Sequence, residues 1–240
     1  ILRELKLISE SNDFKGYISD LGGPTANMYK MKGREISLCK KCKRDSCIYP
    51  GICKNLNISH KPLLDLYKLA SGNKRIKKSF ISSGIRYDLF LNDKSYLDDS
   101  GKEYLRELIQ NHTSGRLKVA PEHTEESVLK LMGKPSFSSF VFLKSEFDRI
   151  NKREGSRYQL IPYFISSHPG CTIEDMKKLA LNPALKWVVV EQVQDFTPTP
   201  MTRSSAAFYT GVDPVTEKKI FVERDIDKKR KQKSFFFNNF

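Results

Sequence analysis

Long apolar runs are absent from this sequence of 240 residues. No stretch approaches the roughly 20 consecutive apolar residues that a helix needs to cross a bilayer, so the sequence predicts no membrane span. The start of the chain also lacks the charged, apolar and small-residue regions that make up an export signal. We therefore expect a cytoplasmic protein whose cysteines stay reduced, which makes disulfide bonds the weaker interpretation.

Acidic residues are in deficit, and an initiator methionine is missing. The first residue is Ile1, which favours a chain that begins part-way through a longer protein. Lys and Arg number 42 against 28 Asp and Glu, and the net charge is +14. Such an excess favours contact with RNA or phosphate-bearing ligands, although no aromatic-interleaved recognition motif accompanies it, so a solvated lysine-rich surface is the simpler interpretation. The densest basic block lies near the end: Lys228, Lys229, Arg230, Lys231 and Lys233.

Short apolar segments alternate with segments of helical periodicity. The expected strands are 14–20, 79–83, 117–120, 159–165 and 187–193. The expected helices are 1–10, 62–70, 102–110, 124–132, 136–153 and 173–181, the fifth with Phe137, Phe140, Val141, Phe147 and Ile150 facing inward. Parallel neighbouring strands need a crossover that usually contains a helix. The pattern predicts an α/β fold, an open or partial β/α barrel over residues 1–205, with a cysteine-rich insertion at about 33–57. Residues 206–240 would add a small hairpin and a basic tail.

Polar, glycine and histidine residues follow each expected strand. In a β/α barrel the active site forms at the carboxyl ends of the strands, so this rim is the expected site. Turn formation alone could explain any one of these segments. The candidates for acid–base work are Glu122, His123 and His168, although each histidine could equally satisfy a loop backbone. Gln194 and Asp195 end the last strand and are expected to face the cavity.

Four of the five cysteines lie close together. Cys39, Cys42, Cys47 and Cys53 have the spacing C-x2-C-x4-C-x5-C, which is not that of a zinc ribbon built from two pairs. Thiolates are the natural ligands of zinc and of iron–sulfur clusters. The spacing favours a metal site, with structural zinc and an accessory cluster both open, against scattered reduced thiols. Cys171 stands alone and is expected to be an ordinary small residue.

The segment 14–29, FKGYISDLGGPTANMY, closely resembles part of the YgiQ-type radical S-adenosylmethionine (SAM) proteins. Five further segments resemble the same family in the same order, so the resemblance extends from about residue 14 to residue 222. They are 42–56 (CKRDSCIYPGICKNL), 117–135 (LKVAPEHTEESVLKLMGKP), 161–176 (IPYFISSHPGCTIEDM), 191–200 (EQVQDFTPTP) and 209–214 (YTGVDP).

The resemblance implies a radical SAM barrel. In such proteins a Cys-x3-Cys-x2-Cys loop holds a [4Fe–4S] cluster whose open iron takes SAM, and an external electron donor triggers hydrogen abstraction from the substrate. No Cys-x3-Cys-x2-Cys occurs in this sequence, so the chain alone is expected to lack the catalytic cluster, as a fragment or as a degenerate remnant. The substrate is not implied. The alternative is a non-catalytic metal-binding module that contacts RNA through its basic surface.

The resemblance also implies roles for single residues. Gly22 and Gly23 occupy the position of the turn that receives the methionine amino group of SAM. Pro24 stands where that turn has an acidic residue, which keeps the expected backbone contact but weakens the side-chain one. Ser83 and Arg86 follow the next expected strand and would meet the ribose or the carboxylate, since an Arg fork fits a carboxylate well.

Overall fold

A computed structural model describes residues 1–23 and 25–237, so Pro24 lies outside the described residues. The chain divides into two compact units. Unit 1 comprises Ile1–Val119 and Phe142–Leu160, and unit 2 comprises Ala120–Val141 and Ile161–Phe240. The division passes through the strands β3 (Arg116–Glu122) and β4 (Gln159–Ser166), and each unit is described by itself. None of the helices in the described ranges has the length and apolar character that crossing a membrane requires.

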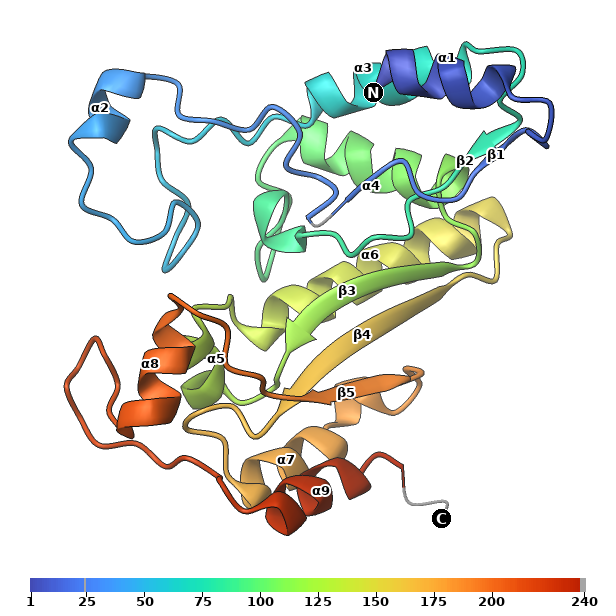
Figure 1. The fold of residues 1–240 in the computed structure, drawn as a ribbon. Helices are drawn as coiled ribbons and strands as arrows, with labels where there is room; N and C mark the ends of the chain where they lie inside the picture. Colours follow the sequence, from blue (N-terminus) through green and yellow to red (C-terminus); the bar gives the residue numbers. More distant parts are fainter. Residues whose placement is uncertain (24, 238–240) are drawn as a thin grey trace. The chain divides into compact units, whose positions relative to one another are not determined.

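Unit 1 places helices beside a short parallel pair of strands (Figure 1). Strand β1 (Tyr17–Ile18) pairs with β2 (Lys78–Ser79), and further along Ile85 forms an isolated parallel bridge with Val119 of β3. Helix α3 packs against both α1 and α4. The helices are α1 (Leu2–Glu10), α2 (Ile36–Lys40), α3 (Lys61–Ser71), α4 (Asp99–Asn111) and the later part of α6 (Phe137–Glu154), with a 3-10 turn, η1, at Tyr87–Leu89.

The core of unit 1 is built on aromatic side chains. Tyr67, Phe90 and Tyr104 are fully buried. The ring of His60 stacks on Tyr104 with centroids 4.6 Å apart, and Phe90 meets Tyr104 edge-on at 5.6 Å. Helix α4 begins next to this cluster. Asp98 caps its start, since the carboxylate accepts a hydrogen bond from the Gly101 N–H at 2.7 Å. The cap therefore fixes the helix register that brings Tyr104 into the core.

The first turn of α4 approaches the core so closely that only glycine fits at position 101. A Cβ added to Gly101 would lie 2.5 Å from Phe90 Cβ and 3.1 Å from its backbone. We expect Gly101→Ala to lower the free energy of unfolding by about 1–3 kcal/mol, because the overpacking outweighs the better helix propensity of alanine. The control is Gly84→Ala, whose Cβ would meet only the Lys118 carbonyl at 3.9 Å. Urea unfolding of both variants tests this, and equal effects would contradict it.

The three-stranded sheet has the order β3-β4-β5, and unit 2 contains the end of β3, most of β4 and the whole of β5 (Gln192–Asp195). Strand β4 pairs with β5 in parallel register from Tyr163↔Gln192 to Ser166↔Asp195. Helix α9 packs against both α7 and β5. The helices are α5 (Glu126–Met132), the first residues of α6, α7 (Ile173–Ala180), α8 (Arg203–Thr210) and α9 (Ile226–Ser234), with a 3-10 turn, η2, at Pro183–Leu185.

The expected α/β fold is confirmed, but a barrel is not. In the described part of the chain the strands form one sheet of two strands and another of three, and neither closes. The strand expected at 187–193 is wrong in its start, because Trp187 is 84% exposed and regular pairing begins only at Gln192. Val141, expected to face inward, is 42% exposed, whereas the other four inward residues of that helix are buried. The basic block near the end forms α9, and Val212 makes an antiparallel bridge with Lys219 in the segment where a hairpin was expected.

Candidate functional site

In unit 1, Asp20 ties the turn that follows β1 to the turn that follows β2. Its Oδ1 accepts a hydrogen bond from the Ser82 backbone N–H at 3.1 Å, and its other oxygen accepts one from the Ser83 hydroxyl. The Ser82 hydroxyl in turn donates to the Ser19 carbonyl at 2.7 Å. A Cβ added to Gly22 would lie 2.8 Å from Asp20 Oδ1 and 3.6 Å from Ser83 Cβ. The structure thus brings two expected SAM-binding residues, Gly22 and Ser83, side by side.

Arg86 is held at both its backbone and its side chain. The Asn27 amide accepts from the Arg86 N–H at 2.8 Å and donates to the Arg86 carbonyl at 2.9 Å. The Arg86 guanidinium forms a two-pronged pair with Asp88, with N–O distances of 3.1 and 2.6 Å. Its fork is therefore satisfied within the chain, and a ligand carboxylate would have to compete with Asp88 for it.

Asn27 also contacts a buried histidine, since its Nδ2 lies 3.1 Å from His60 Nε2. Burial lowers the pKa of His60 to about 4, although the Asp98 charge and a backbone hydrogen bond to Ile58 oppose this shift. The imidazole is consequently neutral at pH 7, with Nε2 accepting from the Asn27 amide. This pair stiffens the segment that carries the glycine turn.

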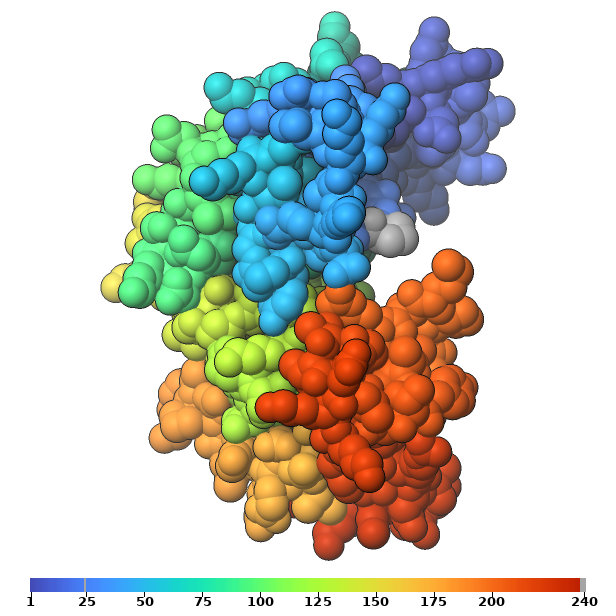
Figure 2. Space-filling model, turned by 90° about the vertical axis from the view of Figure 1, so that its left-hand side faces the viewer, coloured from blue at the N-terminus to red at the C-terminus, as the bar shows by residue number. Residues whose placement is uncertain are grey.

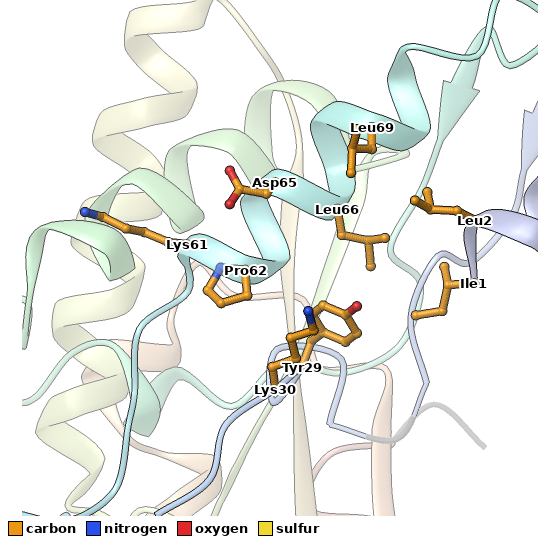
Figure 3. A pocket seen from close by; sticks show the side chains of 9 residues that line it. All are labelled: Ile1, Leu2, Tyr29, Lys30, Lys61, Pro62, Asp65, Leu66 and Leu69. Atoms are coloured by element: carbon orange, nitrogen blue, oxygen red, sulfur yellow. The ribbon is translucent and has the colours of Figure 1, made fainter. Parts of the chain in front are cut away.

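Beside the glycine turn of unit 1 lies a groove of about 730 Å³, which we call the glycine-turn groove. It is mostly apolar and lined by α1, the end of β1, the turn and α3, and it carries the carboxylates of Glu4 and Asp20. A second hollow of about 620 Å³ shares Ile1, Tyr29 and Leu66 with it (Figure 3). Both volumes lie in the range of small-molecule sites, about 300–1,000 Å³. A cationic, partly apolar ligand matches this lining.

In unit 2 the strand ends carry unusual backbone. Glu122 ends β3 with φ 68°, and Ser167 follows β4 with φ 58°, both in the left-handed region that non-glycine residues rarely adopt. Such positions cost about 1–3 kcal/mol each and concentrate at functional sites. The Glu122 carboxylate pairs with Lys134 at 2.8 Å. Two strained residues at neighbouring strand ends mark this edge of unit 2 as a candidate site.

Asp195 links the ends of β4 and β5 in the same unit. Its Oδ1 accepts from the Ser166 hydroxyl at 2.8 Å, and its Oδ2 pairs with Lys233 of α9 at 2.9 Å. Gln194 is exposed, and its backbone carbonyl accepts from the Ser166 hydroxyl at 3.3 Å. The side chain of Asp195 thus lies at the strand ends, while that of Gln194 faces solvent.

The two histidines of this edge are buried. His123 Nδ1 accepts from the Glu125 N–H at 3.0 Å, and its Nε2 lies 3.5 Å from Cys171 Sγ. His168 Nδ1 lies 2.8 Å from the Pro169 carbonyl, and its Nε2 lies 2.8 Å from a serine hydroxyl, that of Ser204. Their exposed fractions are 0% and 3%. Both rings are therefore shielded from bulk solvent.

Burial lowers the pKa of His123 and of His168 to about 4. For His123, the Asp175 charge opposes the shift and His168 adds to it. For His168, the Pro169 carbonyl opposes it. Burial also raises the pKa of Cys171 to about 12, so this cysteine is a neutral thiol. At pH 7 the two imidazoles can donate and accept hydrogen bonds, but they carry no positive charge.

Sequence reasoning missed three residues that organise these sites: Asp20, Asn27 and Gln232. Asp20 lies in the turn that follows β1, where the sequence pattern indicates only the glycines. Gln232 is fully buried, and its Oε1 accepts from the Ser167 N–H at 2.8 Å. It stands inside the basic block, whose charge pattern is typical of a solvated segment and hides a single buried amide.

The four clustered cysteines lie in a loop of unit 1 that contains α2 (Figure 2, in blue to light blue). All are free thiols, three exposed and Cys53 half-buried. Among the residues that the structure describes, no three Cys, His, Asp or Glu side chains are placed to hold a metal ion. The expected thiolate site is therefore not assembled in this arrangement of the loop.

Each unit is built from helices and strands and, taken by itself, carries polar residues where its strands end. No family model matches the chain. A UPF0313 protein of Bacteroides thetaiotaomicron is 56% identical over 239 residues, covering 99% of this chain and 38% of the relative. UPF0313 proteins of Porphyromonas gingivalis and Methanosarcina acetivorans are 52% and 42% identical, covering 99% and 98% of this chain and 38% and 30% of those relatives. The chain belongs to the UPF0313 family over the segment it spans, which confirms the resemblance found in the sequence.

The chain spans about 38% of the length of the first two of these relatives. Among solved structures, coproporphyrinogen III oxidase (HemN) from Escherichia coli, a radical SAM enzyme, aligns with a TM-score of 0.49 and 14% identity. That alignment covers 78% of this chain and 38% of the other. A likeness at this TM-score does not define the fold of the chain.

Proposed function

We propose that this chain is part of a radical SAM enzyme and that its glycine-turn groove binds SAM. The six motif segments and the family membership support the class. The observation that carries the binding site is the turn at Gly22, fixed by Asp20 and Ser83 and opening on the glycine-turn groove. The substrate is unknown, and an external electron donor would be required.

The chemistry of the groove fits SAM, which carries a sulfonium, an ammonium group and an adenine ring. Asp20 and Glu4 provide carboxylates for the cationic groups, and Leu21, Leu63 and Leu66 provide an apolar wall for the adenine. Because Gly22 has no side chain, its backbone can approach the ligand closely. The task of these residues would be to bind and orient SAM and to exclude water.

The catalytic cluster does not fit the residues present. Within the ranges the structure describes, no three Cys, His, Asp or Glu side chains are placed to hold a metal ion, and the sequence holds no Cys-x3-Cys-x2-Cys, the motif that binds this cluster. No residue of this chain is therefore assigned as a ligand of the catalytic cluster. The cysteines that bind it would have to come from outside these 240 residues. With such a segment present, cluster and SAM together would supply hydrogen-atom abstraction.

Unit 2 would supply the residues that bind the substrate and transfer its protons. Glu122 and Asp195 are the acid–base candidates. Each carboxylate lies at the end of a strand and forms an ion pair with a lysine. The buried His123 and His168 would act as neutral hydrogen-bonding groups behind them. The alternative, an RNA-binding metal module, is not favoured. Two cations of its basic helix α9 are engaged within the chain, Arg230 with Asp227 and Lys233 with Asp195.

Binding of SAM to this chain tests the proposal. We expect Asp20→Asn and Gly22→Val each to weaken the affinity by about 10-fold or more, since a charge-assisted contact is worth about 1.5–3 kcal/mol and the valine would fill the turn. Asp148→Asn, which removes an exposed carboxylate paired with Lys144, is the matched control and should leave the affinity unchanged. Isothermal titration gives the affinities, and thermal unfolding verifies that each variant is folded. Equal affinity in folded Gly22→Val would place SAM elsewhere.

A further inference from the structure

We propose that Cys39, Cys42, Cys47 and Cys53 form a closed metal centre of four thiolates, whose task is to hold the loop between Gly33 and Leu56 in a defined fold. This inference is independent of the proposed SAM chemistry. Four protein ligands around one metal leave no open position, which is the arrangement of a structural site rather than a catalytic one.

The loop is anchored at its base. Gly33 and Leu56 form an antiparallel bridge, and the Arg34 N–H donates to the Asn55 carbonyl at 2.7 Å. The Asn55 side chain accepts from the Glu35 N–H at 2.9 Å and donates to the Glu35 carbonyl at 2.8 Å. These bonds fix where the chain leaves and re-enters unit 1. They do not organise the part between, which carries the four thiols.

Beyond that base the loop has no core of its own. No residue from 33 to 56 is buried, and the two apolar side chains of α2, Ile36 and Leu38, are 50% and 53% exposed. Ordering a residue costs about 1–2 kcal/mol of backbone entropy, which buried apolar surface normally offsets. This loop lacks that source of stability, and a structural metal supplies folding free energy directly.

Backbone hydrogen bonds already link the four cysteines in two pairs. Cys42 N–H donates to the Cys39 carbonyl at 3.1 Å, and Cys53 N–H donates to the Cys47 carbonyl at 2.7 Å. Two sulfurs also accept hydrogen bonds, Cys39 Sγ from the Asn55 amide at 3.2 Å and Cys42 Sγ from the Arg44 N–H at 3.4 Å. Bonds of this kind to sulfur orient metal ligands and stabilise thiolate charge.

The charge of the loop complements four thiolates. A divalent metal with four thiolates carries a net charge of about −2, since each thiol loses its proton to solvent as the metal–sulfur bond forms. Cations outnumber carboxylates in the loop: Arg34, Lys40, Lys41, Lys43, Arg44 and Lys54 against Glu35 and Asp45. The Arg44 guanidinium also donates to the carbonyls of Ser46 and Gly51, which draws the segments of the two pairs together. Metal binding would bring the two pairs of cysteines together around one ion.

Metal content of the purified chain, the double variant Cys42→Ser/Cys47→Ser and the control Cys171→Ser tests the proposal. The double variant removes one thiol from each pair, while the control removes the fifth, buried cysteine. One preparation is loaded with Zn²⁺, and another is loaded anaerobically with iron and sulfide, and each is then desalted. Elemental analysis and sulfide assay separate a zinc centre from an iron–sulfur cluster. Trypsin cleavage after Lys40, Lys41 and Lys43 reports whether the loop closes.

We expect one metal centre per chain in the unchanged protein and in Cys171→Ser, with the loop protected from trypsin. In the double variant we expect the metal content and the protection to fall by about 10-fold or more. Because the loop has no buried residue, far-UV circular dichroism of the double variant should match that of the unchanged chain. Unchanged metal content in a folded double variant would overturn the proposal, and so would a chain that retains neither metal.

Discussion

Lowering the pH from 7 to 4 is expected to unfold this chain. Burial lowers the pKa of His60, His123 and His168 from 6.5 to about 4, and protonation of each in the native state is therefore unfavourable. The unfolded chain binds these protons near pH 6.5, so the stability is fully present above that pH and is lost as the pH falls toward 4. Each histidine contributes about 3 kcal/mol to this loss. Three such losses approach the whole stability of an ordinary domain, about 5–15 kcal/mol.

Urea unfolding at intervals between pH 7 and pH 4 measures the effect. His168→Gln removes one titrating group. The slope of the free energy of unfolding against pH should then correspond to about one fewer proton taken up on unfolding. The carboxylate of Glu146 affects the stability in a lower pH range, because hydrogen bonds from Arg149 lower its pKa. Its contribution to the free energy of unfolding is lost only below about pH 4.5. A free energy of unfolding that stays constant from pH 6.5 to pH 4 would show that these imidazoles are accessible to water.

Removal of one aromatic ring from the sheet of unit 2 should have a comparable effect. Phe164 lies on β4, is fully buried, and stacks on Phe236 with centroids 6.3 Å apart. We expect Phe164→Ala to lower the free energy of unfolding by about 3–5 kcal/mol, through lost burial and the cavity left behind. Phe236, two residues beyond the end of α9, would also lose its packing partner on the strand.

The control is Trp187→Ala, which deletes a larger side chain that is 84% exposed in the same unit. We expect it to change the free energy of unfolding by less than about 0.5 kcal/mol. Calorimetry of both variants gives the comparison. If the Phe164→Ala and Trp187→Ala variants unfolded at the same temperature, β4 would not carry the core of unit 2.

Six of the helices, α1 and α3 to α7, were predictable because their signals are local, whereas α2, α8 and α9 were not predicted. The apolar spacing of α6 and the proline in the first turn of α3 placed both within a residue or two of the observed ends. The strands of unit 1 were predicted too long, since apolar residues at 14–20 and 79–83 can pack without pairing. Only Tyr17 and Ile18 of the first range and Ser79 of the second pair in β1 and β2. The predicted start of β5 was wrong for a similar reason, because the apolar composition around Trp187 does not show which side chains are buried.

The candidate site was predictable only in outline. Polar residues after strands located both turns of unit 1 and the strand ends of unit 2. The sequence did not show that the Arg86 fork is engaged by Asp88, or that His123 and His168 are buried, because these depend on tertiary contacts. The left-handed conformation of Glu122 and Ser167 was likewise invisible, since neither residue type signals it.

Formation of 5′-deoxyadenosine tests most directly our proposal that this chain is part of a radical SAM enzyme. The most direct measurement uses a protein that joins this segment to one containing Cys-x3-Cys-x2-Cys, reconstituted anaerobically with iron and sulfide and supplied with SAM and a reductant. We expect 5′-deoxyadenosine to form, in a smaller amount with Gly22→Val and in an unchanged amount with Asp148→Asn. A protein that holds a full cluster, binds SAM and forms no 5′-deoxyadenosine would contradict it.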